Sequence, residues 1–306
     1  MKNNTTFKEN FEVIIIGGSY AGLSAALALG RSLREALIID NELPCNRQTP
    51  HSQNFLTQDG KTPKEITTVA REQVEKYETI QFYQGKAISG IKTETDFEIR
   101  TDKNEKFTAK KLIFATGIKD LFPEIKGFSE CWGISVIHCP YCHGYEYRGK
   151  NTAIIANGER AFHLISMVHQ LTKQITVFTS GTSDFDQDQR EKLKEKNIEI
   201  IETEITEILH KSGYLKSMVL KDGTSLSFDA AYAAIPFVQS SEIPLALGCE
   251  LTENDHMQID QFQKTNIAGI FACGDNSNMM RSVAKAVYSG SVAGAMVNAE
   301  LVKEEF

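Results

Sequence analysis

Residues 14–26 read IIIGGSYAGLSAA, which joins the end of an apolar run to a glycine-rich stretch and an alanine-rich segment. The apolar, β-branched residues 11–16 predict a buried strand, residues 17–22 a glycine-rich turn, and residues 23–34 a helix. The turn is similar to G-x-G-x-x-G, whose three glycines make a tight turn, admit a pyrophosphate and let the helix pack on the strand. Gly17 and Gly22 hold the outer positions, and the small Ser19, next to Gly18, holds the middle one.

The start of the predicted helix suits a phosphate, because helix N-termini carry free backbone N–H groups and a partial positive charge. Residues 36–39 form a second apolar strand that ends at Asp40, about 20 residues after Gly17. An acid at this position accepts hydrogen bonds from ribose hydroxyls and repels a 2′-phosphate. A glycine-rich turn without a ligand is the alternative, but strand, turn, helix, strand and terminal acid together favour a dinucleotide site.

The same order of elements occurs twice along the chain. The first copy continues with a helix at residues 62–77 and a β-meander at 87–115, which has a polar turn at 102–104 and a closing strand at 112–115. The second copy has a strand at 152–155, a turn at 156–161, a helix at 162–171, a strand at 174–178, a meander at 201–228 and a closing strand at 232–235. The pattern predicts an α/β protein with two Rossmann-like domains, three-layer parallel sheets and β-meanders. Residues 267–302, which are too few for a third domain, are expected to complete the first.

Composition and charge exclude several classes of protein. The 306 residues are 41% hydrophobic and 24% charged, which is typical of a globular chain and not of a disordered one. The formal net charge of −7 gives no basic signal for nucleic acid or an anionic membrane surface as a partner. The 6 cysteines are too few for a disulfide scaffold in a chain of this length.

An uncharged run at residues 13–30 has the length of a marginal membrane span or a signal-peptide core. Its N-terminal flank carries Lys2 and Lys8 but also Glu9 and Glu12, so no positively charged segment precedes it. The glycines at positions 17 and 18 also divide the run into a short strand and a helix. We therefore expect neither an export signal nor a membrane span, and a cytoplasmic location.

Residues 138–144 read HCPYCHG and hold the densest chemistry of the chain. The C-x-x-C spacing of Cys139 and Cys142 lets two sulfurs bridge, and a thiolate of such a pair attacks disulfides. Haem attachment through C-x-x-C-H, a zinc site and an inert packed pair are the alternatives. Haem attachment requires export, for which the sequence shows no signal. Structural zinc usually takes a second ligand pair from elsewhere in the chain, and the sequence has no second cysteine pair. The pattern therefore favours a redox dithiol without a metal.

His143 follows the cysteine pair and suits the redox interpretation. Moving a proton from a cysteine of pKa about 8.5 to a histidine of pKa about 6.5 costs about 2.7 kcal/mol. An aspartate of pKa about 3.9 would raise that cost to about 6 kcal/mol. Histidine is therefore an effective acid/base partner at neutral pH. The alternative roles of His143 are a zinc ligand and a packed turn residue.

Four segments in combination resemble the low-molecular-weight thioredoxin reductases, along residues 11–299. IIIGGSYAGLSAA resembles the FAD fingerprint of that family, and CPYCHG at 139–144 lies where the family has C-x-x-C-D-G. LIFATG at 112–117 resembles the closing A-T-G strand, and IFACGD at 270–275 the second FAD motif. The resemblance implies FAD contacts at Ala115, Thr116, Gly117, Gly274, Asp275, Arg281 and Ser282, the last in place of the family's glutamine, and at Asn54 in HSQNFL.

The resemblance also implies how the domains are divided. An FAD-binding domain would be discontinuous, at residues 1–119 plus 242–306, and a second Rossmann-like domain of the NADPH-binding type would lie at 120–241 and carry the C-x-x-C motif. A homodimer is implied as well.

The family assigns roles to the redox residues. Cys142 would lie against the flavin as the charge-transfer thiolate, Cys139 would exchange with the substrate, and His143 would replace the family's aspartate as acid/base. With Pro140 and Tyr141 between the cysteines, this replacement resembles the dithiol oxidase branch of the family. Those enzymes close disulfides in small natural products and pass the electrons to oxygen.

The second glycine-rich turn departs from the family pattern. Residues 156–161 read ANGERA, so Ala156 replaces the first glycine and Glu159 puts negative charge where a pyrophosphate would lie. The family ends the next strand with a His-Arg-Arg cluster for the 2′-phosphate, whereas residues 177–181 read VFTSG. Charged phosphate contacts are difficult to replace, so the departures favour a domain that keeps its fold without NADPH. The alternative is that Arg160 or Lys173 substitutes for the cluster.

The sequence thus predicts an FAD-dependent dithiol–disulfide oxidoreductase that uses Cys139 and Cys142. Its substrate would be a small dithiol or disulfide or a thioredoxin-like protein, and nicotinamide use is not favoured. An NADPH-dependent thioredoxin-disulfide reductase and a non-catalytic flavin or zinc redox sensor are the alternatives.

The other cysteines have no partner at motif spacing and are predicted to pack in the interior: Cys45, Cys131, Cys249 and Cys273. Cys45 is also a candidate neighbour of FAD, because it lies close in sequence to Asp40. The single tryptophan, Trp132, is predicted to be a core residue.

Overall fold

The computed structural model describes residues 8–306, so the flanking residue Lys2 lies outside the described residues. The chain forms two compact units. Unit 1 comprises residues 8–47, Lys64–Lys119 and Val238–Phe306, and unit 2 comprises Gln48–Pro63 and Asp120–Phe237. These boundaries differ from the predicted domains at residues 48–63, which group with unit 2, and at 238–241, which group with unit 1.

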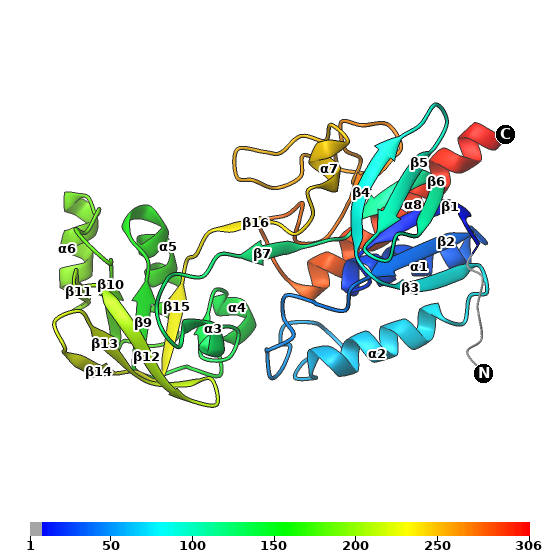
Figure 1. Cartoon of the computed structure of the whole chain (residues 1–306). Coiled ribbons are helices and arrows are strands. Elements are labelled where there is room, and N and C mark those ends of the chain that lie inside the picture. The colour runs from blue at the N-terminus through cyan, green and yellow to red at the C-terminus, as the bar shows by residue number, and fades with distance from the viewer. Residues whose placement is uncertain (1–7) are drawn as a thin grey trace. The chain divides into compact units, whose positions relative to one another are not determined.

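Unit 1 is built on a seven-stranded sheet that contains the strand of the fingerprint (Figure 1). Strand β1 (Asn10–Ile16) pairs in parallel with β2 (Ala36–Asp40) on one side and with β6 (Lys106–Phe114) on the other. Helix α1 (Tyr20–Arg31) connects β1 to β2, so the predicted β-α-β unit is confirmed. The side chains of β1 from Val13 to Ile16 are buried, because a parallel sheet is covered on both faces.

The other elements of unit 1 extend this sheet or cover it. They are α2 (Pro63–Val74), β3 (Ile80–Gln84), β4 (Ala87–Lys92), β5 (Phe97–Thr101), α7 (Ile243–Ala246), β17 (Ile270–Ala272) and α8 (Val283–Glu305).

Strand β6 joins the predicted meander to the parallel strands. Its first half pairs antiparallel with β5, which in turn pairs with β4, and its last three residues pair in parallel with β17. The C-terminal segment therefore completes unit 1, as predicted. Helix α8 then packs along α1, where a Cβ atom added to Gly290 would lie 2.1 Å from the backbone oxygen of Ala21. The small residues of the two helices let their backbones touch.

Unit 2 contains a five-stranded parallel sheet and a separate three-stranded antiparallel meander. The sheet consists, in spatial order, of β11 (Glu199–Ile201), β10 (Ile175–Phe178), β9 (Thr152–Ile155), β15 (Ala230–Ala233) and β8 (Val136–Ile137). The meander is β12 (Ile205–Lys211), β13 (Tyr214–Leu220) and β14 (Ser225–Ser227). The helices are α3 (Phe128–Cys131), α4 (Pro140–His143), α5 (Gly158–Val168) and α6 (Gln187–Glu195). The chain crosses between the units at β7 (Ile118–Asp120) and β16 (Phe237–Gln239), which pair with each other.

Several predicted boundaries were wrong. Helix α5 begins at Gly158, inside the predicted turn at 156–161, because Asn157 caps the helix there. The meander begins at Ile205, and Ile201 belongs to β11 of the parallel sheet instead. Helix α6 was not predicted at all, since only Leu193 of its residues is buried and the sequence shows no apolar period.

Helix α1 begins three residues earlier than predicted and ends at Arg31 rather than at residue 34. Leu33 has a φ of 58°, a left-handed conformation that ends the helix. Arg34 therefore lies in the connection to β2 and not on the helix.

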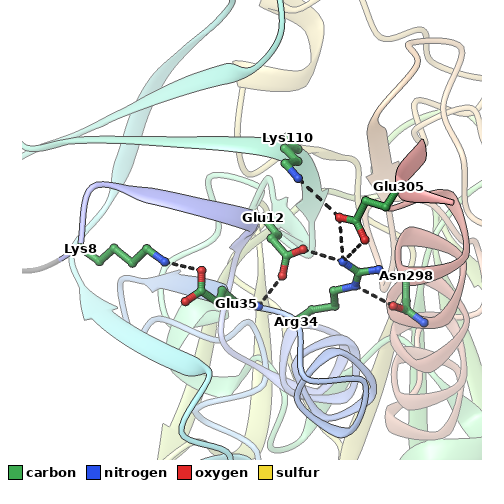
Figure 2. A network of polar contacts seen from close by, with 7 residues as sticks. All are labelled: Lys8, Glu12, Arg34, Glu35, Lys110, Asn298 and Glu305. Carbon is green, nitrogen blue, oxygen red and sulfur yellow. Dashed lines mark hydrogen bonds and ion pairs between the residues drawn. The ribbon is translucent and has the colours of Figure 1, made fainter. Parts of the chain in front are cut away.

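Arg34 joins three parts of unit 1 through its guanidinium group (Figure 2). Its Nη1 donates to Oε1 of Glu12 at 2.6 Å and to Oε2 of Glu305 at 2.8 Å, and its Nε donates to Oδ1 of Asn298 at 2.8 Å. The Arg34 side chain is only 12% exposed, whereas Lys8, which pairs with Glu35 in the same network, is 42% exposed.

We expect Arg34→Met to lower the free energy of unfolding of unit 1 by about 1–3 kcal/mol, because it leaves the carboxylate of Glu12, which is only 19% exposed, without its guanidinium partner. Lys8→Met is the matched control and should cost less than about 1 kcal/mol, since its ion pair is exposed. Urea unfolding of both variants, followed by circular dichroism, measures the difference. Equal losses would contradict the prediction.

Candidate functional site

Most of the predicted cofactor residues meet at one edge of the sheet of unit 1. They lie at the carboxyl ends of parallel strands, where ligands bind in open α/β sheets. They are Gly17, Gly18, Ser19 and Gly22 after β1, Asp40 at the end of β2, Ala115, Thr116 and Gly117 after β6, and Gly274 and Asp275 after β17.

Close backbone contacts explain two glycines of the turn. Gly17 has a φ of 106°, and a Cβ atom there would lie 2.3 Å from the backbone oxygen of Ala115. A Cβ atom on Gly22 would lie 1.8 Å from the backbone oxygen of Gly17. The turn between β1 and α1 is therefore packed against the end of β6 without any intervening side chain.

The first turn of α1 leaves its backbone N–H groups available to a ligand. Ser19 is the N-cap residue, but its side chain forms no capping hydrogen bond, and the first turn contains no acidic residue. Gly18 lets Asp40 approach the turn, since a Cβ atom on Gly18 would lie 2.9 Å from Oδ2 of Asp40. Donors for a pyrophosphate and an acceptor for a ribose are thus adjacent, and the cradle fits FAD.

Two polar side chains of unit 1, those of Arg281 and Cys45, lie close to the carboxylate of Asp275. Nε of Arg281 lies 3.7 Å from its Oδ2, and Sγ of Cys45 lies 3.8 Å from the same oxygen. Ser282 is the N-cap of α8, where its Oγ accepts a hydrogen bond from the backbone N–H of Lys285 at 3.1 Å. The prediction that Cys45 packs in the interior was wrong, because Cys45 is exposed.

The other three cysteines outside the pair are buried, as predicted. Burial raises the pKa of Cys131 to about 11 and that of Cys273 to about 12. Burial also raises the pKa of Cys249. These three residues therefore remain protonated thiols at neutral pH and lack the reactivity of a thiolate.

Asn54 is the predicted cofactor residue that groups with unit 2. Its φ is 60°, and its backbone N–H donates to Oδ1 of Asp59 at 2.6 Å. Its contact with FAD stays a prediction.

Sequence reasoning missed Asn276, which is fully buried next to Asp275 and contacts the end of β6. No motif marks it, since its partners lie far away in the sequence.

At the corresponding helix N-terminus of unit 2, the first backbone N–H of α5 is bonded to a side chain of the same unit. Oδ1 of Asn157 accepts hydrogen bonds from the backbone N–H groups of Gly158 and Asp184, both at 2.8 Å. Nδ2 of Asn157 donates to the backbone oxygen of Thr182 at 3.0 Å. Asparagine before a helix is a capping signal, so the sequence contained the evidence for the bond to Gly158 but not for the bond to Asp184.

Acidic groups surround the same turn. Glu159 lies in the first turn of α5, and its Oε2 accepts from Nε2 of Gln189 at 2.7 Å. After β11, Oε1 of Glu202 accepts from the backbone and the hydroxyl of Ser183 at 2.8 and 2.6 Å, and these bonds lower the pKa of Glu202. Lys173, a proposed substitute for the phosphate cluster, contacts His169 at the other end of α5 instead.

Cys139 and Cys142 form a disulfide at the start of α4, with their Cα atoms 5.3 Å apart. Cys139 is the N-cap residue of this helix, Pro140 is its first residue, and the backbone N–H of Cys142 donates to Sγ of Cys139 at 3.2 Å. Gly144 lets the motif pack closely, since a Cβ atom there would lie 2.4 Å from Cδ1 of Leu171. The predicted pair is thus able to accept two electrons.

His143 ends α4 and is partly buried. Burial lowers its pKa below the ordinary value of 6.5, and the charge of Glu146 opposes this shift. The imidazole is therefore neutral at pH 7 and able to accept a proton from a thiol.

Trp132 is buried as predicted, stacks on the rings of Phe128 and His138, and donates from Nε1 to Asp120 at 3.0 Å.

Within residues 8–306 no group of three or more histidine, cysteine or acidic side chains is arranged to hold a metal ion. No helix in the same range combines the length and the apolar character that crossing a membrane requires.

Comparison with known proteins gives consistent matches along nearly the whole chain. Residues 11–290 match the family model described as pyridine nucleotide-disulphide oxidoreductase. Thioredoxin reductase tcpT of Claviceps purpurea is 30% identical over 310 residues, which cover 96% of this chain and 95% of the relative. A solved oxidoreductase from Agrobacterium tumefaciens is 38% identical, with a TM-score of 0.90 over 96% of this chain and 99% of that one. The putative thioredoxin reductase TrxB from Bacillus anthracis is 29% identical, with a TM-score of 0.92 over 97% and 100% of the two chains.

The cradle of unit 1 and the disulfide of unit 2 define an FAD-dependent thiol-disulfide oxidoreductase similar to thioredoxin reductases. The chain belongs to the pyridine nucleotide-disulphide oxidoreductase family. The fold and the cofactor FAD predicted from the sequence are confirmed.

Proposed function

We propose that this enzyme is a dithiol oxidase, which closes the disulfide of a small dithiol substrate and does not use NADPH. The observation that carries the proposal is the cap of α5, where Oδ1 of Asn157 accepts from the backbone N–H of Gly158, the first residue of the helix, and from that of Asp184 in the loop after β10. A pyrophosphate bound there would have to displace this cap and approach the carboxylates of Glu159 and Asp184. Both changes oppose the binding of a dianionic ligand.

The contrast between the two helix N-termini supports the proposal. Ser19 leaves the first turn of α1 uncapped by its side chain, whereas Asn157 caps α5. The first turn of α1 lacks an acid, whereas that of α5 contains Glu159. Each difference disfavours a phosphate at unit 2, and neither disturbs the Rossmann-like fold of that unit.

The redox pair supports two exchange steps. A substrate thiolate attacks Sγ of Cys139, forms a mixed disulfide and releases Cys142 as a thiolate. The second substrate thiolate then attacks the substrate sulfur of the mixed disulfide, which releases Cys139 and the closed substrate disulfide. His143 accepts one of the two thiol protons, and the other passes to solvent. FAD held by the glycine-rich turn and Asp40 of unit 1 would supply the acceptor for the two electrons of the reduced pair, and molecular oxygen would be reduced to hydrogen peroxide.

An anaerobic titration of the yellow holoprotein tests the proposal. We expect the flavin absorption to bleach on addition of dithiothreitol, to recover in air, and to remain unchanged with NADPH or NADH. Rapid bleaching by NADPH would overturn it and leave NADPH-dependent thioredoxin-disulfide reductase as the function. The relatives named thioredoxin reductase, including tcpT, are the observation that favours this second candidate.

A homodimer is expected from the family resemblance and forms part of the proposal. Analytical ultracentrifugation of the holoprotein at micromolar concentration tests it. A species with the mass of one chain, 34.1 kDa, would contradict it.

The lowered pKa of His143 gives a pH prediction. The neutral base persists as the pH falls until the pH passes this pKa, so the acidic limb of kcat/KM for dithiol oxidation should lie below pH 6.5. His143→Gln should remove this limb and lower kcat/KM about 10²-fold or more. Oxygen uptake between pH 5 and 8 measures both effects. His169→Gln, at the C-terminal end of α5, is the control and should leave the pH profile unchanged. Persistence of the acidic limb in His143→Gln would contradict the role of His143 as the base.

A further inference from the structure

We propose that Asn276 is a positioning residue of the FAD site, which makes the hydroxyl of Thr116 a hydrogen-bond donor to the cofactor. Thr116 lies directly after β6 at the carboxyl edge of the sheet and is half-buried. Asn276 lies 160 residues further along the chain and is fully buried. The inference concerns the FAD site alone and does not depend on which substrate reduces the flavin.

The orientation of the Asn276 amide follows from its partners. Its Nδ2 lies 2.8 Å from the backbone oxygen of Phe114, which can only accept a hydrogen bond. The NH₂ group must therefore face Phe114, and the amide cannot be reversed. The second hydrogen of the same group is donated to Oγ1 of Thr116, which lies 3.3 Å from Nδ2.

The backbone of Asn276 is held as firmly as its side chain. Its backbone oxygen accepts from the N–H of Met257 at 2.8 Å and from Nε2 of Gln239 at 2.9 Å. Asn276 thus joins the loop that contains Asp275 to the end of β6, with three chain segments bonded to one residue.

The hydrogen bond that Asn276 donates to Thr116 limits where the Thr116 hydroxyl can donate its own hydrogen. Because Oγ1 of Thr116 accepts a hydrogen bond from Asn276, its own hydrogen must point elsewhere. Among residues 8–306 the Thr116 hydroxyl has no hydrogen-bond acceptor, although the residue is accessible at the cofactor edge. The Ala115 oxygen next to it contacts the glycine-rich turn, so Thr116 borders the predicted phosphate cradle. An oxygen or nitrogen acceptor of FAD is the partner that this geometry suits.

Exchange of Asn276 for aspartate reverses the polarity without changing the size of the side chain. A carboxylate can only accept from Thr116. A protonated carboxyl group would use its one hydrogen for Phe114 and would still accept from Thr116. In both states the Thr116 hydroxyl turns towards residue 276 and is lost to the cofactor.

The test measures the dissociation constant of FAD from apoprotein, by the quenching of flavin fluorescence, in a double-mutant cycle. We expect Thr116→Val and Asn276→Asp each to raise the dissociation constant of FAD about five- to tenfold. The double variant should have a dissociation constant no higher than that of the single variant that binds FAD less tightly. Thr116→Ser, which keeps the hydroxyl, should bind FAD within about twofold of the unchanged protein. The flavin absorption spectrum of each variant provides a second readout.

Two results would overturn the proposal. Unchanged FAD binding in Thr116→Val would show that the hydroxyl does not bind the cofactor. A full additional loss from Asn276→Asp in the Thr116→Val background would show that Asn276 acts on the fold and not through Thr116. Since Thr116→Val and Thr116→Ser are conservative exchanges at a half-buried position, the first result is available even if Asn276→Asp fails to fold.

Discussion

Replacement of Cys142 by serine is expected to lower turnover of any dithiol at least about a thousandfold while FAD stays bound. A serine hydroxyl cannot form the disulfide that Cys139 and Cys142 make in the structure, so the exchange steps lose their electron acceptor. Cys139→Ser should have the same effect, because both sulfurs of the pair are required. Oxygen uptake with dithiothreitol measures turnover, and the absorption of the purified protein measures bound FAD.

Cys249→Ser is the matched control for this loss. Cys249 is buried in unit 1, and its Sγ lies 3.7 Å from Oγ1 of Thr265, so serine retains a polar contact there. Turnover should stay within about twofold of the unchanged protein, because this thiol takes no part in exchange. Turnover in Cys142→Ser that approached the control would refute the role of the pair.

Gly22→Ala is expected to abolish FAD binding. The added Cβ atom would lie 1.8 Å from the backbone oxygen of Gly17 and 2.9 Å from its carbonyl carbon. Neither backbone atom can rotate away, so α1 must shift from β1 and carry its N-terminal N–H groups out of place. We expect FAD affinity to fall more than about a hundredfold and the protein to be purified without yellow colour.

Gly223→Ala controls for the general effect of an added methyl group. Gly223 lies in the turn between β13 and β14 and has a φ of 88°. A Cβ atom added there would have no neighbouring atom within 4 Å. The left-handed conformation makes alanine cost about 1 kcal/mol there, but FAD binding in unit 1 should not change. Retained FAD in Gly22→Ala, measured by absorption after gel filtration, would contradict the proposed cradle.

The contiguous motifs were predictable because their chemistry is local. Strand, turn and helix at residues 10–31 follow from apolar runs and glycines that neighbour one another in the sequence. The spacing of Cys139 and Cys142 places their sulfurs in one turn of chain, so the disulfide also follows from the sequence. The return of residues 270–272 to the first sheet was predicted because residues 267–302 are too few for a third domain.

Helix boundaries and one surface position were less predictable. Helix α6 has a single buried residue, so its helical period is not visible as an apolar pattern. Cys45 shares its residue type with three buried cysteines, and its exposure depends on the path of a loop. Asn157 did contain a usable signal, since a capping residue before Gly158 marks the true start of α5.

The fold class, the FAD fingerprint and the redox pair were predictable from the sequence, because each appears as a pattern of residue types and spacings along the chain. The tertiary structure set the second bond of Asn157, to the backbone N–H of Asp184, since the two residues meet through the return of the chain after β10. It also decided the partner of Thr116, which Asn276 reaches from another strand end. Hydrogen bonds of this kind form between segments that the sheet brings together, and no pattern along the chain records them.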